Sequence, residues 1–116
     1  QPQIKIYSLE QVQKHWHKYN AVPQTMDGIQ FASTKERDRY AELKLLLNAG
    51  KISDLKLQFP MPVYIKDKHI CIWKADFVYW EKKQKIYEDC KGFKTPTYKL
   101  KKKMVEAFYD IEIRET

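Results

Sequence analysis

The chain has 116 residues, of which 43% are hydrophobic and 14% aromatic, enough for one domain with a packed core. No apolar run approaches the roughly 20 residues of a membrane span, and the N-terminal region lacks the apolar stretch of a signal peptide. Two cysteines, Cys71 and Cys90, are too few for a disulfide framework or a zinc site, which favours reduced thiols in a cytoplasmic protein.

The formal net charge is +7, and residues 82–103, with nine lysines and two acids, account for all of it. A basic excess in one segment indicates a polyanionic partner. The alternative is a solvated lysine face that aids solubility. We favour nucleic acid because the lysines surround a short acidic strand.

The chain begins with a predicted helix from Ser8, which ends near Pro23. His15 and His17 are two residues apart and face different ways on a helix, so they are poor joint metal ligands. We assign residues 1–25 to a helical extension and residues 26–116 to the core domain.

A second helix is predicted from Thr34 to Ala49, with Gly50 as its stop. Glu36 has two interpretations. It completes a capping box with Ser33, or it is a ligand at the end of the buried stripe that this spacing predicts. The stripe consists of Glu36, Tyr40, Leu43 and Leu47.

Residues 55–59 alternate between apolar and polar side chains and predict a strand. Pro60 and Pro62 either break this strand or place it at a sheet edge. An extended piece at 63–66 and a turn at 67–69 follow.

Residues 71–80 and 86–91 predict two strands of a hairpin, joined by residues 81–85. This hairpin would bring Asp76 and Asp89 together. Side chains alternate along a strand, so Asp89 and Lys91 point to one side. The other side receives Ile86, Glu88 and Cys90.

After a loop at 92–96, a helix is predicted from Pro96 or Thr97 to about Tyr109, followed by a short strand at 111–114. The apolar side of this helix is predicted to consist of Leu100, Met104, Ala107 and Phe108. The order of elements predicts an α+β fold, an α/β sandwich with a mixed sheet, a central meander and flanking helices.

Three carboxylates and one lysine stand out: Glu36, Asp76, Asp89 and Lys91. Carboxylate oxygens are preferred ligands of Mg²⁺ or Mn²⁺, and a metal with a neighbouring lysine suits phosphodiester hydrolysis. Gln58 is an accessory candidate. The simpler interpretation is that Asp76 and Asp89 form surface ion pairs with nearby lysines, which contribute little.

Asp76 followed by Asp89-x-Lys91 resembles the signature of the PD-(D/E)XK nuclease superfamily. The chain is similar to a small, uncharacterised phage and prophage family of that superfamily in the segments FASTKE (31–36), NAGKI (48–52), LQFP (57–60), ADFVY (75–79) and EDCKG (88–92). One departure is Ala75, where the superfamily usually has proline.

The resemblance implies a restriction-endonuclease-like core and a metal-dependent DNA endonuclease. Glu36, Asp76 and Asp89 would hold Mg²⁺ or Mn²⁺, with the Cys90 backbone carbonyl as an extra ligand, and Lys91 would be the catalytic lysine. Small phage members often act as dimers on branched DNA, as Holliday junction resolvases do, so we expect a homodimer and DNA as partner. The expected DNA-binding lysines are Lys35, Lys94, Lys99, Lys102 and Lys103.

Three alternatives stay open at this point. The first is a non-catalytic DNA-binding accessory protein that keeps the fold. The second is a sequence-specific nuclease subunit of restriction or transposase type. The third is a basic α+β domain that binds RNA or a protein. Because no separate DNA-reading module is evident, we favour structure-selective cleavage over recognition of a long sequence.

Overall fold

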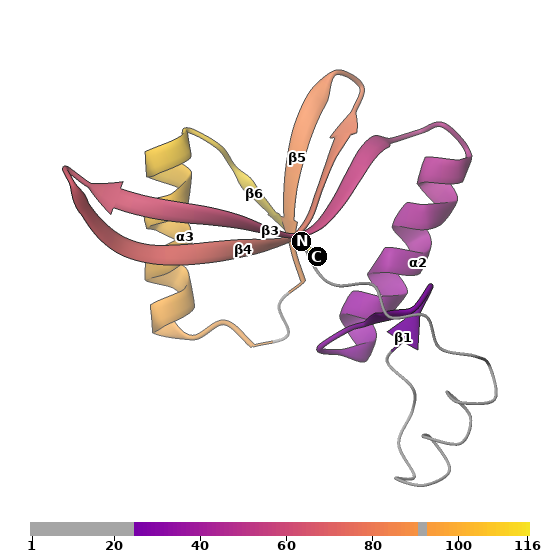
Figure 1. Ribbon diagram of the computed structural model, residues 1–116, viewed down its shortest axis with the longest axis horizontal. Helices are drawn as coiled ribbons and strands as arrows, with labels where there is room; N and C mark the ends of the chain where they lie inside the picture. The colour runs from indigo at the N-terminus through magenta and orange to yellow at the C-terminus, as the bar shows by residue number, and fades with distance from the viewer. Residues whose placement is uncertain (1–24, 91–92) are drawn as a thin grey trace, which may run out of the picture. The chain divides into compact units, whose positions relative to one another are not determined.

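The computed structural model describes residues 25–90 and 93–116 (Figure 1). The predicted helix from Ser8 lies outside these residues. The chain divides into two compact units, one that ends at Leu45 and one from Leu46 to Thr116.

The first unit contains a two-stranded antiparallel sheet and most of the first described helix. Strands β1 (Thr25–Met26) and β2 (Ile29–Gln30) are joined by a tight turn at Asp27 and Gly28, both with positive φ. Helix α2 (Thr34–Asn48) follows.

The predicted bounds of α2 are confirmed. The Ser33 side chain accepts a hydrogen bond from the Glu36 amide at 3.1 Å, which is a helix N-cap. At the other end Gly50 has a φ of +73°, a left-handed conformation that costs glycine little. The Lys51 amide bonds to the Leu46 carbonyl at 2.9 Å, as in a Schellman motif.

The second unit is built on a four-stranded mixed sheet in the order β3-β4-β5-β6. Strands β3 (Ser53–Ile65), β4 (Lys68–Glu81) and β5 (Gln84–Asp89) form an antiparallel meander. Helix α3 (Pro96–Tyr109) then leads to β6 (Ile113–Glu115), which pairs with β5 in parallel. Helices together with this mixed sheet confirm the predicted α+β class.

The two prolines of β3 do not interrupt the strand. Pro60 and Pro62 lie within it, and β3 is at the edge of the sheet, which was one of the two predicted outcomes. Proline is tolerated on an edge strand because its missing N–H can face away from the ladder.

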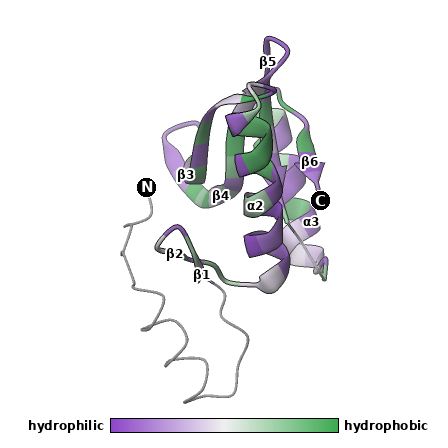
Figure 2. Cartoon of the chain, turned by 90° about the vertical axis from the view of Figure 1, so that its right-hand side faces the viewer, coloured by the Kyte–Doolittle hydropathy of each residue, from purple (hydrophilic) through white to green (hydrophobic). Residues whose placement is uncertain are grey.

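Both hairpin turns are shorter than predicted. The β3–β4 turn consists of Lys66 and Asp67, and the β4–β5 turn of Lys82 and Lys83. Both lysines of the second turn have positive φ, the conformation of a type I′ hairpin turn. Figure 2 shows this turn as the hydrophilic loop above β5, while hydrophobic residues continue along β4.

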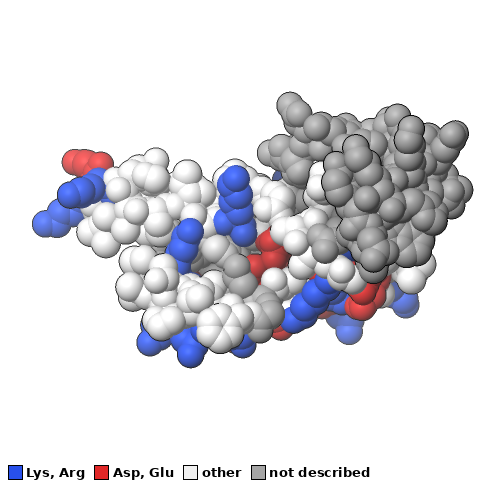
Figure 3. Space-filling model, turned by 90° about the horizontal axis from the view of Figure 1, so that it is seen from below, with Lys and Arg blue, Asp and Glu red and all other residues white. Residues whose placement is uncertain are grey.

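The end of the β3–β4 hairpin is exposed and mixed in character. Apolar and aromatic side chains there include Ile65, which is 56% exposed, and Tyr64, whose ring contacts His69. Basic and acidic side chains lie together at this end of the hairpin, at the left of Figure 3. None of the predicted site residues belongs to this end.

Helix α3 has the predicted bounds, with Thr95 as N-cap and Asp110 as a left-handed C-cap. The predicted apolar side of α3 is wrong: Leu100 is 60% exposed and Phe108 48% exposed, whereas Tyr98 and Val105 are buried. The predicted apolar residues and the residues that are buried both fit a helical period. Hydropathy alone favours the predicted set, which is the more exposed one. The tyrosines decide the face because their hydroxyls find partners inside, Tyr98 on β6 and Tyr109 on the Pro62 carbonyl.

The core of the second unit lies between α3 and the sheet. Val105 of α3 packs there with residues of three strands, namely Met61 and Val63 of β3, Trp73, Ala75 and Val78 of β4, and Ile113 of β6. In the part of the chain that the structure describes, neither helix combines the length and apolar character of a membrane span.

Candidate functional site

A row of polar residues crosses the four-stranded sheet. Leu57 pairs with Phe77, and Phe77 pairs with Glu88. Continuing this register by one residue puts Gln58 opposite Asp76 and Asp76 opposite Asp89. Asp89 in turn pairs with Glu115 of β6. Side chains of directly opposed residues share a face of the sheet, so these four side chains are neighbours.

The Asp76 carboxylate is held from both neighbouring strands. Its Oδ1 accepts a hydrogen bond from the Gln58 side-chain amide at 3.2 Å, and its Oδ2 accepts one from the Cys90 backbone amide at 2.8 Å. The register and these bonds confirm the hairpin that was predicted to bring the Asp76 and Asp89 strands together.

Gln58 adopts a backbone conformation that is unusual within a strand. Its φ is 49°, in the left-handed region that costs a non-glycine residue about 1–2 kcal/mol. Such conformations persist where the surrounding structure fixes them, and they are concentrated at functional sites. Gln58 therefore is a positioned partner of Asp76. Its accessory role in the site stays a prediction.

Asp89 is 2% exposed at the end of β5. Tyr98 of α3 lies beside it. Burial, a hydrogen bond to Glu115 and the neighbouring Asp89 carboxylate, in that order, raise the pKa of the Tyr98 phenol far above its ordinary value. The phenol therefore stays protonated, and its hydroxyl donates to Glu115 Oε2.

Glu115 is held by three donors. The Lys94 and Lys102 ammonium groups lie 3.2 and 3.3 Å from its Oε1, and the Tyr98 hydroxyl donates to its Oε2 at 2.9 Å. Burial acts to raise the pKa of Glu115, but the hydrogen bonds from these three side chains outweigh it and lower the pKa. Glu115 is therefore a carboxylate at neutral pH.

Glu88 faces the opposite side of β5 and belongs to a different network. It is fully buried, and its Oε1 accepts a 2.6 Å hydrogen bond from the Tyr79 hydroxyl. Arg114 donates to the same hydroxyl at 3.2 Å, and Thr116 lies 3.5 Å from the second Glu88 oxygen. Two hydroxyl donors thus contact this carboxylate, and the Arg114 guanidinium contacts one of those hydroxyls.

Glu36 and Lys35 lie on α2 in the first unit. Glu36 is 6% exposed and shares a buried stripe with Tyr40 and Leu43, as the phase of the helix predicted. Its backbone amide donates to the Ser33 hydroxyl, which is one half of the predicted capping box. The role of Glu36 as a ligand stays a prediction. Lys35 is exposed. Asp76 and Asp89 are the two predicted ligands that the second unit itself brings together.

The predicted basic residues have different surroundings. Lys99 and Lys103 are exposed on α3, whereas Lys94 and Lys102 converge on Glu115. Lys91, the predicted catalytic lysine, lies outside the described residues.

The donor set around Asp76 and Asp89 fits a hard divalent cation. Among the described residues, no three His, Cys, Asp or Glu side chains are grouped as a ready-made metal site. Mg²⁺, however, keeps several of its waters and is held in proteins by one or two carboxylates together with substrate phosphates. Two opposed aspartates on adjacent strands meet this requirement.

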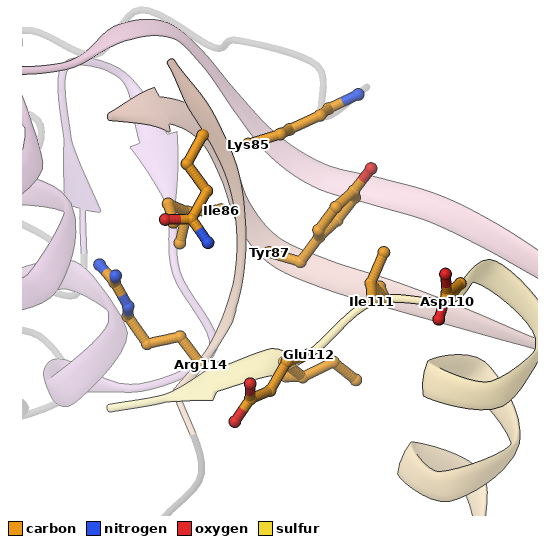
Figure 4. Close-up of a pocket in the computed structure, with 9 residues that line it drawn as sticks. Lys85, Ile86, Tyr87, Asp110, Ile111, Glu112 and Arg114 are labelled. Atoms are coloured by element: carbon orange, nitrogen blue, oxygen red, sulfur yellow. The ribbon is translucent and has the colours of Figure 1, made fainter. Parts of the chain in front are cut away.

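A groove lies at the other end of β5 from Asp89. Its cavity volume is about 460 Å³, and residues 84–87 and 110–114 line it. Lys85 and Tyr87 project to one side of β5, and Ile86 lies on the other side with Arg114 (Figure 4). None of the predicted site residues lines this groove, so the groove and the polar row are separate features.

Tyr98 and Glu115 were not anticipated as members of the site. The spacing of Lys94, Tyr98 and Lys102 at intervals of four was a usable signal, because it places the three on one side of a helix and its N-terminal extension. Glu115 had no such signal, because its place depends on the parallel pairing of β6 with β5.

The family model described as a protein of unknown function, DUF1064, matches residues 16–116, and the chain belongs to this family. No curated protein and no solved structure matches the chain.

Proposed function

We propose that this member of the DUF1064 family is a Mg²⁺- or Mn²⁺-dependent DNA endonuclease that acts on branched DNA. The observation that carries the proposal is the pair Asp76 and Asp89, opposed on adjacent strands beside a lysine-rich helix, with the Asp76 carboxylate fixed by two hydrogen bonds. The proposal includes a homodimer and a place in the cytoplasm of a bacterial host, encoded by a phage or prophage.

The proposed reaction is hydrolysis of a phosphodiester. Water adds to phosphorus, the bond from phosphorus to the leaving sugar oxygen breaks, and that oxygen takes a proton. A bound divalent cation would activate the water and offset the charge that develops on the phosphate oxygens.

The residues of this chain have separate roles in the proposal. Asp76 and Asp89 hold the cation, with the Cys90 carbonyl as a further ligand, and Gln58 fixes the orientation of Asp76. Lys91 orients the water and stabilises the charged oxygen. Exposed lysines of α3 bind backbone phosphates, which makes binding depend strongly on salt concentration.

A non-catalytic DNA-binding protein is the second candidate. The observation in its favour is that no three metal-ligating side chains are grouped within the described part of the chain. It predicts salt-sensitive DNA binding that is independent of divalent cations, with no cleavage products.

A cleavage assay separates the two candidates. The protein is incubated with linear duplex, single-stranded, flap and four-way-junction DNA, each with Mg²⁺, Mn²⁺ or EDTA. The Asp89→Ala variant is run beside Glu112→Gln, which removes an exposed carboxylate. Metal-dependent products that are lost only in Asp89→Ala support the nuclease, and discrete fragments from linear duplex would instead indicate a sequence-specific nuclease.

A binding measurement gives a readout that does not depend on activity. Mn²⁺ is titrated into the protein without DNA and its binding is followed by calorimetry. We expect binding to the parent and a large loss in Asp89→Ala. No cleavage on any substrate, together with equal Mn²⁺ binding by parent and variant, would refute the proposed site.

A further inference from the structure

Three donors from neighbouring positions converge on one carboxylate next to Asp89. Lys94 precedes α3, Tyr98 is in its first turn and Lys102 one turn further, so all three lie along one side. Both ammonium groups contact the same oxygen of Glu115, and the Tyr98 hydroxyl contacts the other.

This donor set resembles what a phosphate group requires. Phosphate oxygens take ammonium and hydroxyl donors, and a lysine acts on them as a point charge. Two positive charges face one negative charge, so the cluster of Lys94, Lys102 and Glu115 keeps a positive excess. Glu115 is the one carboxylate in contact with these lysines in the described structure, and its side chain is 25% exposed.

The cluster of Lys94, Lys102 and Glu115 lies next to Asp89 of the polar row. Glu115 pairs with Asp89 in the parallel register, and Tyr98 lies beside both carboxylates. A phosphate held by Lys94 and Lys102 in place of Glu115 would therefore lie beside Asp89, at the end of the polar row.

We propose that Lys94, Tyr98 and Lys102 form a subsite for a backbone phosphate of nucleic acid, and that the Glu115 carboxylate occupies this subsite in the free protein. Nucleic acid displaces Glu115 from the two lysines when it binds. Glu115 thus lowers the affinity for nucleic acid. At the subsite, a backbone phosphate must take the place of the Glu115 carboxylate when nucleic acid binds. The inference deepens the proposed function, and rests on it only for the choice of nucleic acid as ligand.

The test measures binding in EDTA, where no cleavage occurs. The affinity of a fluorescein-labelled duplex is followed by anisotropy between about 50 and 200 mM salt for the parent, Glu115→Gln and the matched variant Glu112→Gln. We expect Glu115→Gln to bind about fivefold more tightly than Glu112→Gln, with a salt slope steeper by about one. Equal affinities and slopes in the two variants, each confirmed as folded by circular dichroism, would overturn the inference.

A second pair of variants tests the subsite if Glu115→Gln fails to fold. Lys94 is 45% exposed and precedes α3, so Lys94→Ala is expected to fold. Its DNA affinity should fall several-fold below that of Lys51→Ala, which removes an exposed lysine from the α2–β3 connection. Equal losses in the two variants would contradict a specific subsite.

Inorganic phosphate is the third arm, because it has the same chemistry as a backbone phosphate. We expect millimolar phosphate to raise the thermal midpoint of Glu115→Gln, in which the subsite is vacated, together with the gain in DNA affinity. Stabilisation by phosphate without a gain in DNA affinity would show that free phosphate is the ligand and would overturn the choice of nucleic acid. Absence of cleavage in the metal assay leaves these binding differences intact, so the two proposals fail in different ways.

Discussion

Two neighbouring residues of β5, Glu88 and Asp89, are both buried carboxylates, but the two faces of the strand surround them differently. Glu88 is enclosed by hydroxyl donors, with Tyr79 at 2.6 Å and Thr116 at 3.5 Å. Asp89 lies in a row with two further carboxylates, Asp76 and Glu115.

The comparison shows that burial by itself does not mark a functional site. The hydroxyl donors on the Glu88 face of β5 stabilise its charge within the fold, so the burial of Glu88 has a structural explanation. Carboxylates placed side by side repel one another. A cation or a positively charged group between them lowers the free energy of this repulsion. The alternation of a strand separates the two kinds of carboxylate onto opposite faces.

The largest expected effect is a difference in cleavage activity between variants of Asp89 and variants of Glu88. Asp89→Asn keeps the shape of the side chain but removes the charge that the proposed metal requires, so cleavage should fall by about 10³-fold or more. Glu88→Gln should retain cleavage within about threefold of the parent at temperatures where it is folded. The measurement is single-turnover cleavage of a labelled junction in Mn²⁺.

A reversal of these two cleavage rates would contradict the roles assigned to the two faces of β5. If Glu88→Gln loses cleavage while folded and Asp89→Asn keeps it, the catalytic face of β5 is the one that carries Tyr79 and Arg114. The row formed by Asp76 and Asp89 would then be structural.

For the free energy of unfolding we expect the opposite order, with a larger loss on substitution of Glu88 than of Asp89. Glu88→Ala removes the acceptor of a buried, charge-assisted hydrogen bond and leaves the Tyr79 hydroxyl inside, so the free energy of unfolding should fall by about 2 kcal/mol. Asp89→Asn relieves repulsion among carboxylates and should leave the free energy unchanged or raise it. Urea denaturation with a constant m-value measures both, and a larger loss in Asp89→Asn would contradict the assignment.

The parts of the fold that local signals specify could be predicted from the sequence. Ser33 and Gly50 bound α2, Pro96 begins α3, and the apolar strands around Lys82 form the hairpin that holds Asp76. Caps, glycine stops and strand alternation depend on a few neighbouring residues, so they can be predicted from the local sequence.

The parts that depend on distant segments could not be predicted. The buried face of α3 was assigned to Leu100 and Phe108, because the partners that draw Tyr98 and Tyr109 inward lie on β6 and β3. Glu115 joined the site only through parallel pairing across the whole of α3. Non-local pairing has no sequence period, so it is absent from any analysis of local patterns.

A pH titration tests whether the contacts of Lys94, Lys102 and Tyr98 stabilise the Glu115 carboxylate. Its pKa is lowered in the folded protein, so the unfolded state binds more protons as pH falls, and the stability from Glu115 is present above about pH 4.5 and is lost at lower pH. The difference in unfolding free energy between the parent and Glu115→Gln should therefore shrink from pH 6 to about pH 3. A difference that is constant over this range, measured by urea denaturation at each pH, would show that the lysine contacts do not stabilise the charged form.

The smallest expected effect concerns the cap that sets the phase of α3. The Thr95 side chain accepts a hydrogen bond from the Tyr98 amide at 3.1 Å, so the cap acts on the residue whose hydroxyl contacts Glu115. Thr95→Ala should lower the free energy of unfolding by about 1 kcal/mol, and Thr95→Ser, which keeps the hydroxyl, should restore most of it. Thermal melts of the two variants measure this. Equal losses in both would mean that the threonine methyl, and not the hydroxyl, fixes the start of α3, and that the position of Tyr98 beside Asp89 depends on packing instead of on the cap.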